Sequence, residues 1–406
     1  MLNDGWIKTS ELMALSQKKD ILFWGAGTGC KRTIECAGLQ PAKIIDSNPN
    51  FHDVIMEGAR VVPYSKALAT DDSVVIITTG SYPSLIQQVC HLHPELKLGV
   101  NLFISPIFEP MKVRDSLLAF DKNILYTVPL TVEEGGGLYL FNTLNRRNQK
   151  LYAGECRALI KVDSGYMMCD GLRGLVIFDH EFKVEKTVEL PAGSRPHGLA
   201  FSEPNQMAYV VCSGRDSICF IDVKQSVCVD EVFISNKCRI NGMNEQHHLN
   251  DVCLSDDGTS LFVSMFSFSG KWRLDVFDGG VIIFNLNSKQ FESPIISQLW
   301  MPHTVKIVRG VLSVADSMRG TLHSGSNNLL GDFPGFIRGF DFSDGFYCIG
   351  QSSHRYLDKL QGHSRSIQLN AGIYIFDPDS CANVFHPIDK GDNIYTVLVS
   401  DRSFEL

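Results

Sequence analysis

The sequence predicts two folds in one chain: an N-terminal Rossmann-like parallel sheet of the α/β class, followed by an all-β propeller of six blades, with seven as the alternative. Two observations predict the propeller. One short sequence motif recurs through the second half of the chain, and the segments between its copies alternate apolar and polar residues like β-strands. A third observation, the alternation of strands and helices near the N-terminus, predicts the parallel sheet. We expect the first domain at residues 1–120 with its linker and the propeller at 121–406.

The first domain is predicted from unbroken apolar strands separated by helical segments. Strands are expected at residues 21–24, 42–46 and 73–79, and helices at 31–38 and 82–91. Strands without polar alternation are typical of a parallel sheet that is covered on both faces.

A glycine-rich turn follows the first strand. Gly25, Gly27 and Gly29 would bring backbone N–H groups close to a phosphate at a helix N-terminus, and Asp46 could accept hydrogen bonds from ribose hydroxyls. The third glycine of the dinucleotide fingerprint is replaced by Cys30. That replacement argues against a nicotinamide cofactor, and the alternative to a bound nucleotide is that the glycines serve only strand–helix contact.

This segment resembles the domain found at the front of sugar acetyltransferases and other sugar-modifying enzymes. The likeness is carried by Gly25-Ala26-Gly27 and Ile45-Asp46-Ser47-Asn48-Pro49 and covers about 90 residues. The resemblance implies a nucleotide or sugar-nucleotide ligand near Gly25, Gly27, Gly29 and Asp46.

The recurring motif of the second half lies at the start of each predicted inner strand of the propeller. Its copies lie near Arg157, His197, Asp251, His303 and Arg338, with spacings of 40, 54, 52 and 35 residues. These spacings bracket the ~40–50 residues of one four-stranded blade. Residues 123–142 supply only part of a further blade, and we expect its inner strand to come from residues 393–399, so that the two ends close the ring.

The starts of the inner strands are expected to converge at one mouth of the central channel. His197, His248 and His303 are therefore candidate ligands of a divalent metal, Zn²⁺, Mn²⁺ or Fe²⁺, with Asp251 as a further ligand or general base. Arg338 and Arg157 are candidate catalytic residues that would clamp a carboxylate or phosphate. The alternative is structural: histidines that hydrogen-bond the backbone of a neighbouring blade, and an Asp251 that caps a turn.

Two insertions add further candidates. The first contains His354, Arg355, His363 and Arg365 and is expected to bind a phosphate or sugar, or to be a solvated surface loop. In the second, Trp272 offers an aromatic platform for a sugar ring.

The second half of the chain resembles an uncharacterised group of bacterial propeller proteins known as a conserved domain of unknown function. The shared motifs are His248-Leu249-Asn250-Asp251, Gly279-Gly280-Val281, Met301-Pro302-His303, residues 334–339 and residues 350–353. More loosely, Pro196-His197-Gly198-Leu199 resembles the inner strands of propeller lyases and lactonases that hold a divalent metal on the axis.

Composition limits the classes of partner. A net charge of −8 and a pI near 5.8 argue against a nucleic acid or an anionic membrane as the main partner. No stretch has the length of a membrane span and the N-terminus lacks a signal-peptide pattern, so a cytoplasmic protein is expected. The sequence thus favours a metal-assisted lyase, epimerase or hydrolase that acts on an anionic sugar or sugar nucleotide at the propeller axis. The alternative function is a non-catalytic glycan- or protein-binding scaffold in a cell-surface polysaccharide pathway.

Overall fold

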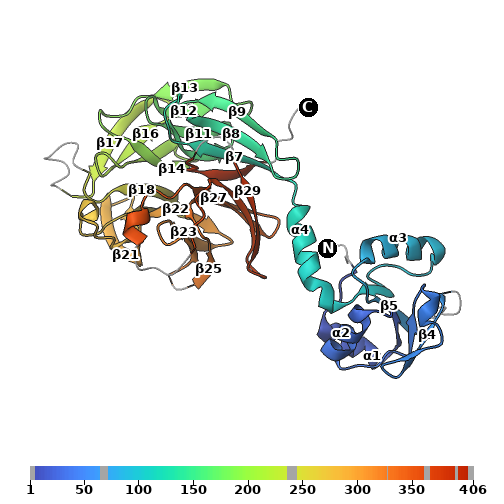
Figure 1. Cartoon of the computed structure of the whole chain (residues 1–406). Helices are drawn as coiled ribbons and strands as arrows, with labels where there is room; N and C mark the ends of the chain where they lie inside the picture. The colour runs from blue at the N-terminus through green and yellow to red at the C-terminus, as the bar shows by residue number, and fades with distance from the viewer. Residues whose placement is uncertain are drawn as a thin grey trace. The chain divides into compact units, whose positions relative to one another are not determined.

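The computed structural model describes residues 5–64, 72–235, 245–326, 328–360, 366–388 and 392–400. The chain divides into two compact units, Met1–Ser116 and Leu117–Leu406, and each is described by itself (Figure 1). The division falls within residues 103–122, where the apolar patterns of the sequence break down. No helix in the described ranges has both the length and the apolar character needed to cross a membrane.

The first unit contains a mostly parallel sheet. Its elements in chain order are α1 (Thr9–Ser16), β1 (Asp20–Trp24), α2 (Thr28–Ala37), β2 (Lys43–Ile45), η1 (Pro49–Phe51), β3 (Ile55–Met56), β4 (Ala59–Val62), β5 (Ser73–Ile77), α3 (Tyr82–Leu92), β6 (Leu102–Ile104), η3 (Pro106–Phe108) and α4 (Glu109–Leu118). The strand order is β3-β4-β2-β1-β5-β6, and only the β3–β4 pair is antiparallel. The predicted parallel sheet is therefore confirmed.

Helical crossovers are present for only part of this sheet. Helix α2 links β1 to β2 and α3 links β5 to β6, whereas only the short η1 and β3 lie between β2 and β4. The narrower Rossmann-like assignment stays a prediction.

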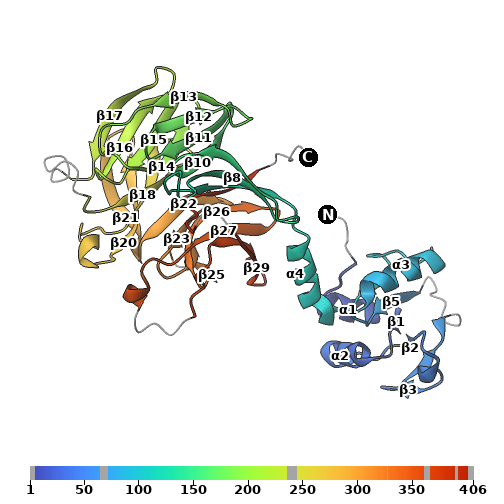
Figure 2. The same ribbon diagram turned by 45° about the horizontal axis from the view of Figure 1, so that its top comes forward.

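The second unit is a propeller of six four-stranded sheets, which confirms six blades rather than seven (Figures 1 and 2). Blade 1 holds β10 (Cys156–Val162), β11 (Gly165–Asp170), β12 (Gly174–Phe178) and β13 (Val184–Val188); blade 2 holds β14 (Pro196–Ser202), β15 (Met207–Cys212), β16 (Ser217–Asp222) and β17 (Val227–Phe233); blade 3 holds β18 (Leu249–Leu254), β19 (Ser260–Met265), β20 (Gly279–Asn285) and β21 (Gln290–Leu299). Blade 4 holds β22 (Pro302–Val308), β23 (Val311–Asp316), β24 (Thr321–Ser324) and β25 (Asn328–Asp332); blade 5 holds β26 (Phe336–Ser343), β27 (Phe346–Ser352), β28 (Gly372–Asp377) and β29 (Ala382–Pro387). Short 3₁₀ helices η4 (Trp272–Leu274) and η5 (Leu357–Leu360) lie in the insertions of blades 3 and 5.

Blade 6 joins the two ends of the propeller sequence, as predicted. Strand β30 (Val397–Ser400) pairs antiparallel with β7 (Asn123–Val128), which continues to β8 (Gly137–Asn142) and β9 (Asn148–Ala153). The innermost strands of successive blades contact one another, and β30 contacts both β26 and β10. This closure gives every inner strand a neighbouring inner strand on each side around the axis.

Two glycines let the inner strands approach closely. A Cβ at Gly198 would lie 2.6 Å from the Cα of Asp251, and a Cβ at Gly339 would lie 2.3 Å from the amide nitrogen of Val397. Neither distance is compatible with a side chain, so glycine at these positions sets the distance between neighbouring blades.

Candidate functional site

One residue from each inner strand belongs to a ring around the propeller axis. In blades 1 to 5 the pairing of the innermost strand shifts register next to this residue, because a β-bulge interrupts the strand at the same place in every blade. A bulge re-aims the side chain at the interruption. The six equivalent positions are occupied by Arg157, His197, Asn250, His303, Arg338 and, in blade 6, Tyr395.

This register corrects the predicted equivalence of the three histidines. Asn250, not His248, holds the ring position in blade 3, and it is fully buried. His248 lies two residues earlier, with a φ of +50°. Arg195 and Met301 stand two residues before His197 and His303, with φ values of +47° and +53°.

A second layer next to the ring is formed by the residues with these positive φ values, Arg195, His248 and Met301. The left-handed conformation costs a non-glycine residue on the order of 1–3 kcal/mol, and it persists where the surrounding structure enforces it. The carbonyls of Arg195 and Met301 accept hydrogen bonds from the Nδ1 atoms of His197 and His303, at 2.8 and 2.9 Å. The strained residues therefore orient the ring histidines.

Five of the six ring residues, all except Asn250, line one cavity of about 230 Å³ at the axis together with Arg195 and His248 of the second layer, and all six blades contribute to it. Its walls are formed by Pro129, Arg157, Arg195, His197, Glu245, His248, Phe266, Trp272, Arg273, His303, Phe336, Arg338, Arg355, Tyr356, Asn393 and Tyr395. Five arginines thus face a single glutamate. Glu245 pairs with Arg195 at 2.7 Å and Arg273 at 3.3 Å and also bonds His248 Nδ1, so its charge is already shared.

Arg338 is the central cation of the cavity. Its guanidinium donates to Asn393 Oδ1 at 2.6 Å and to His303 Nε2 at 3.0 Å, and it lies over the Tyr395 ring at 5.0 Å. Among the described residues no carboxylate pairs with it. Burial lowers the pKa of Arg338 to about 10, so the group is charged at neutral pH in surroundings that disfavour its charge.

Three N–H groups in the cavity have no hydrogen-bond partner within the described part of the chain. They are Arg157 Nη1, Arg338 Nε and Trp272 Nε1, and they come from blades 1, 5 and 3. Arg157 also lies 3.7 Å from Glu155, a long contact for an ion pair. Buried donors that lack partners cost roughly 1–3 kcal/mol each. A ligand rich in acceptor oxygens would offset that cost.

The ring histidines His197 and His303 are neutral at physiological pH. Burial and the charge of Arg157 hold the pKa of His197 well below its ordinary value, and burial and Arg338 do the same for the pKa of His303. Because a backbone carbonyl can only accept, Nδ1 carries the proton in both rings and Nε2 is the acceptor. In His303 this acceptor already binds Arg338, whereas His197 Nε2 is available to a ligand.

The three histidines do not fit a divalent metal. Among the residues that the structure describes, no group of three or more His, Cys, Asp or Glu is arranged to hold a metal ion. The His197 and His248 rings are 5.2 Å apart edge to face, and His248 stacks on Phe266 at 3.9 Å. Arg338 and Arg157 add positive charge beside these rings. The donor set suits an anion better than a cation.

Asp251 is not brought together with the histidines. It lines a different cavity of about 380 Å³, whose walls come largely from apolar inner-strand residues such as Leu199, Val252 and Phe340. Its carboxylate accepts the Val305 amide at 3.0 Å, and burial raises the pKa of Asp251 to about 7. The structure thus groups Arg157, His197, His248, His303 and Arg338 and leaves Asp251 apart.

In the first unit, the four predicted nucleotide-binding residues line one cavity of about 470 Å³ that follows β1, β2 and β5. The Asp46 carboxylate accepts the amides of Ala26 at 2.7 Å and Asn48 at 2.8 Å, so it holds the turn together. A Cβ on Gly29 would lie 2.1 Å from the carbonyl oxygen of Thr78, which assigns Gly29 to strand–helix contact. Gly25 has a φ of +116°, whereas a Cβ at Gly27 would meet nothing within 4 Å.

Several cavity residues were not anticipated. Tyr395 and Asn393 were missed as site residues although their strand was predicted. A signal for Tyr395 is present in the sequence, since Tyr395 follows Ile394 as Arg338 follows Ile337. Glu245 and Arg195 carry no sequence signal beyond their place just before a predicted inner strand. Arg355 and Trp272, which were candidates in the insertions, do line the cavity, whereas His363 and Arg365 lie outside the described residues.

Solved structures with this architecture are distant in sequence. A chain of a nidogen/laminin complex is 8% identical with a TM-score of 0.50, over 68% of this chain and 98% of that chain. A protein of unknown function from Bacteroides caccae is 12% identical with a TM-score of 0.49, over 70% of this chain and 100% of the other. A protein provisionally described as a gluconolactonase is 12% identical with a TM-score of 0.43, over 62% and 90%. The first likeness concerns the fold alone, and the other two are too loose to support an argument.

No curated protein matches the chain. Residues 190–399 do match one family model, described as a domain of unknown function, DUF4915. The matched segment is more than half of the chain and contains five of the six ring residues, all except Arg157. The chain therefore belongs to the DUF4915 family.

Proposed function

We propose that the propeller binds an anionic sugar, free or as part of a larger ligand, in the axial cavity. The observation that carries the proposal is the Arg338 guanidinium, which is partly buried, charged and without a carboxylate partner among the described residues. A fixed cation in a poorly hydrated cavity is stabilised by a carboxylate or phosphate, and arginine binds either in a bidentate manner.

The remaining walls suit the rest of such a ligand. Trp272, Tyr356 and Phe336 offer flat apolar surfaces for a sugar ring, and Trp272 Nε1 is an unpartnered donor for a ring or hydroxyl oxygen. Arg157 Nη1 offers a second donor to the anion.

The experiment is calorimetric titration with galacturonate and, as a matched neutral ligand, galactose, at low ionic strength and pH 7.5. We expect galacturonate to bind and galactose to bind at least tenfold more weakly, because only the former supplies an anion to Arg338. The Arg338→Met variant should bind galacturonate no more tightly than galactose. Equal affinity for both sugars in the wild-type protein would refute the proposal.

The predicted divalent metal is tested in the same titration. Because the donor set suits an anion, we expect binding of galacturonate to survive treatment with EDTA. Stoichiometric metal in the purified protein, lost in His303→Ala together with galacturonate binding, would instead favour the metal-assisted enzyme.

A second candidate, lyase or epimerase activity on the bound uronate, is favoured by the neutral His197. A guanidinium that neutralises the carboxylate acidifies the adjacent C–H, and His197 Nε2 is the available base of the cavity. We expect deuterium to enter at the carbon next to the carboxylate in D₂O, observed by proton NMR, and to be lost in His197→Asn. Binding without exchange would favour the non-catalytic scaffold.

We propose separately that the first unit binds a nucleotide. The supporting observation is that a side chain at Gly27 would extend into open space beside the cavity, where Arg32 also lies. A thermal-shift screen with nucleotides and sugar nucleotides should give a stabilising ligand whose effect is lost in Gly27→Val, a change that the open space tolerates. A shift that survives this substitution would contradict the proposal.

A further inference from the structure

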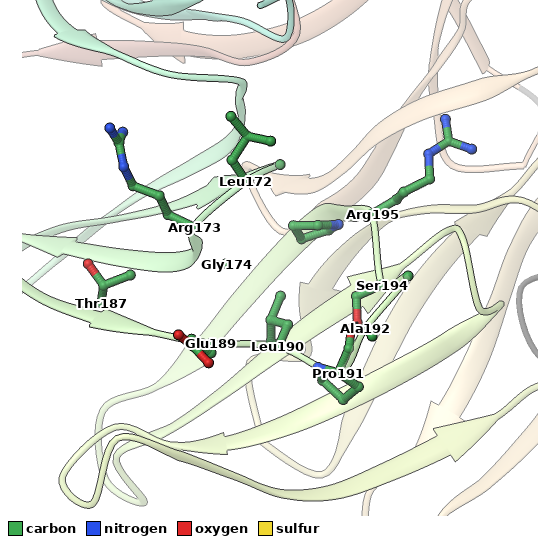
Figure 3. Close-up of a pocket in the computed structure, with 13 residues that line it drawn as sticks. Leu172, Arg173, Gly174, Thr187, Glu189, Leu190, Pro191, Ala192, Ser194 and Arg195 are labelled. Carbon is green, nitrogen blue, oxygen red and sulfur yellow. Dashed lines mark hydrogen bonds between the residues drawn. The ribbon is translucent and has the colours of Figure 1, made fainter.

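A groove on blades 1 and 2 lies next to the axial cavity and is larger than it. The groove has a volume of about 530 Å³, and its walls are the turn Gly171–Gly174 between β11 and β12 and residues 189–196 between β13 and β14 (Figure 3). Figure 3 shows Arg173 and Arg195 on opposite sides of this groove.

Arg195 connects the two cavities because it lines both. Its side chain is 54% exposed, and its guanidinium pairs with Glu245 of the axial cavity at 2.7 Å. The φ of +47° at Arg195 is strained and allows its carbonyl to orient His197. One residue thus contributes to the groove, to the axial cavity and to the position of a ring histidine.

The size of the axial cavity indicates that it holds only part of a ligand. Pockets for small molecules usually measure roughly 300–1,000 Å³. The axial cavity, at about 230 Å³, is below this range, and the groove supplies the missing volume.

The walls of the groove favour a saccharide over a nucleotide as the continuation of the ligand. Arg173 is held in place over the Tyr152 ring, by the carbonyl of Ala153 at 3.1 Å and beside the Asp170 carboxylate at 3.6 Å. Leu172 is 75% exposed, and Glu189 is the one carboxylate among the described residues that line the groove. No aromatic ring among the described residues lines the groove, so a nucleobase would find no stacking partner among them. Fixed guanidinium groups beside aliphatic surface suit carboxylate-bearing sugar rings, which have both anionic and apolar faces.

We propose that this groove is an extension subsite for an anionic oligosaccharide whose terminal anionic sugar occupies the axial cavity. The inference rests on the proposed function of that cavity and adds the chain length of the ligand. The ligand is then an acidic glycan of two or more sugars, and Arg195 lies at the junction between the terminal sugar and the next.

The experiment is a calorimetric series with mono-, di- and trigalacturonate on the full chain, at pH 7.5 and fixed ionic strength. We expect the wild-type affinity to rise at least tenfold from the monosaccharide to the trisaccharide. Ala192→Trp places a large side chain in the groove at an exposed position outside the axial cavity, so this gain should vanish while affinity for galacturonate changes less than twofold. Leu172→Ser, at an exposed position, should reduce the gain without affecting folding. Ser288→Trp, in the exposed turn between β20 and β21, is the matched control and should behave as wild type.

The outcomes separate the two proposals. Binding of galacturonate with no gain from added sugars overturns the subsite and leaves the axial site standing. A gain that persists in Ala192→Trp, or UDP-galacturonate binding more tightly than the trisaccharide, also overturns it. Failure of all galacturonates to bind the wild-type protein overturns the axial site and the subsite together.

Discussion

Replacing Arg338 by methionine should leave the stability of the propeller nearly unchanged while abolishing anion binding. The folded structure lowers the pKa of Arg338 from 12.5 to about 10, which corresponds to a cost of about 3 kcal/mol for keeping the group charged, at 1.36 kcal/mol per unit. For a base with a depressed pKa this cost is fully present below the folded pKa and disappears as the pH rises above it. The full cost of keeping Arg338 charged therefore contributes to the free energy of unfolding measured at pH 7.5.

The substitution also removes two hydrogen bonds of a charged group, to Asn393 and His303, worth about 1.5–3 kcal/mol each. The removed cost of burying the charge offsets most of this loss, so the variant should keep a free energy of unfolding close to the wild-type value. Arg215→Met is the contrasting control, because Arg215 makes two hydrogen bonds to Glu231, at 2.7 and 2.9 Å. Its loss strands a partly buried carboxylate, so we expect that control to be destabilised.

The assay is hydrogen exchange of propeller peptides across a urea series, which reports this unit separately from the first. An Arg338→Met midpoint close to that of the wild-type protein, against a shift of Arg215→Met to lower urea, supports the account. If both variants lose stability equally, the Arg338 guanidinium is already satisfied within the protein, and the reasoning for an anion site fails.

Further outcomes follow from other contacts. Because the folded structure depresses the pKa values of His197 and His303, the unfolded chain takes up protons first as the pH falls below about 6.5, and stability is lost there by up to ~1.4 kcal/mol per pH unit for each group. The double variant with phenylalanine at both positions should flatten this acid slope in urea titrations, and an unchanged slope would show that other groups control it. Deletion of residues 393–406 removes β30 and should abolish cooperative unfolding of the propeller but not of the first unit, as read by hydrogen exchange. Gly339→Ala should cost about 1–3 kcal/mol, because its Cβ would approach Val397, and a neutral result in urea unfolding would contradict the close contact. Gly29→Ala should destabilise the first unit by a similar amount through the Thr78 carbonyl, measured by its own peptides.

The fold could be predicted because its signals are local and repeated. The spacing of the inner-strand motifs indicated the number of blades, and the alternation of apolar and polar residues at 393–399 indicated which strand closes the ring. The parallel sheet was visible in unbroken apolar strands, but the missing helix between β2 and β4 was not, because that connection has no strong pattern.

The site could be predicted only in part, because its geometry depends on a bulge. The register shift at each inner strand decides which residue enters the ring, and it selects Asn250 over His248 in blade 3 and turns Asp251 toward another cavity. A one-residue difference in a strand reverses the face on which a side chain lies. The charge balance of the cavity could not be predicted from the sequence either, because Glu245 forms ion pairs with Arg195 and Arg273 only in the folded structure.

The most direct test of the axial anion site is a crystal structure of the full chain grown with saturating galacturonate. We expect density for one carboxylate within hydrogen-bond distance of both the Arg338 and Arg157 guanidinium groups. A ligand bound elsewhere on the propeller, or an axial cavity that holds only solvent while the crystals are saturated with galacturonate, would contradict the account.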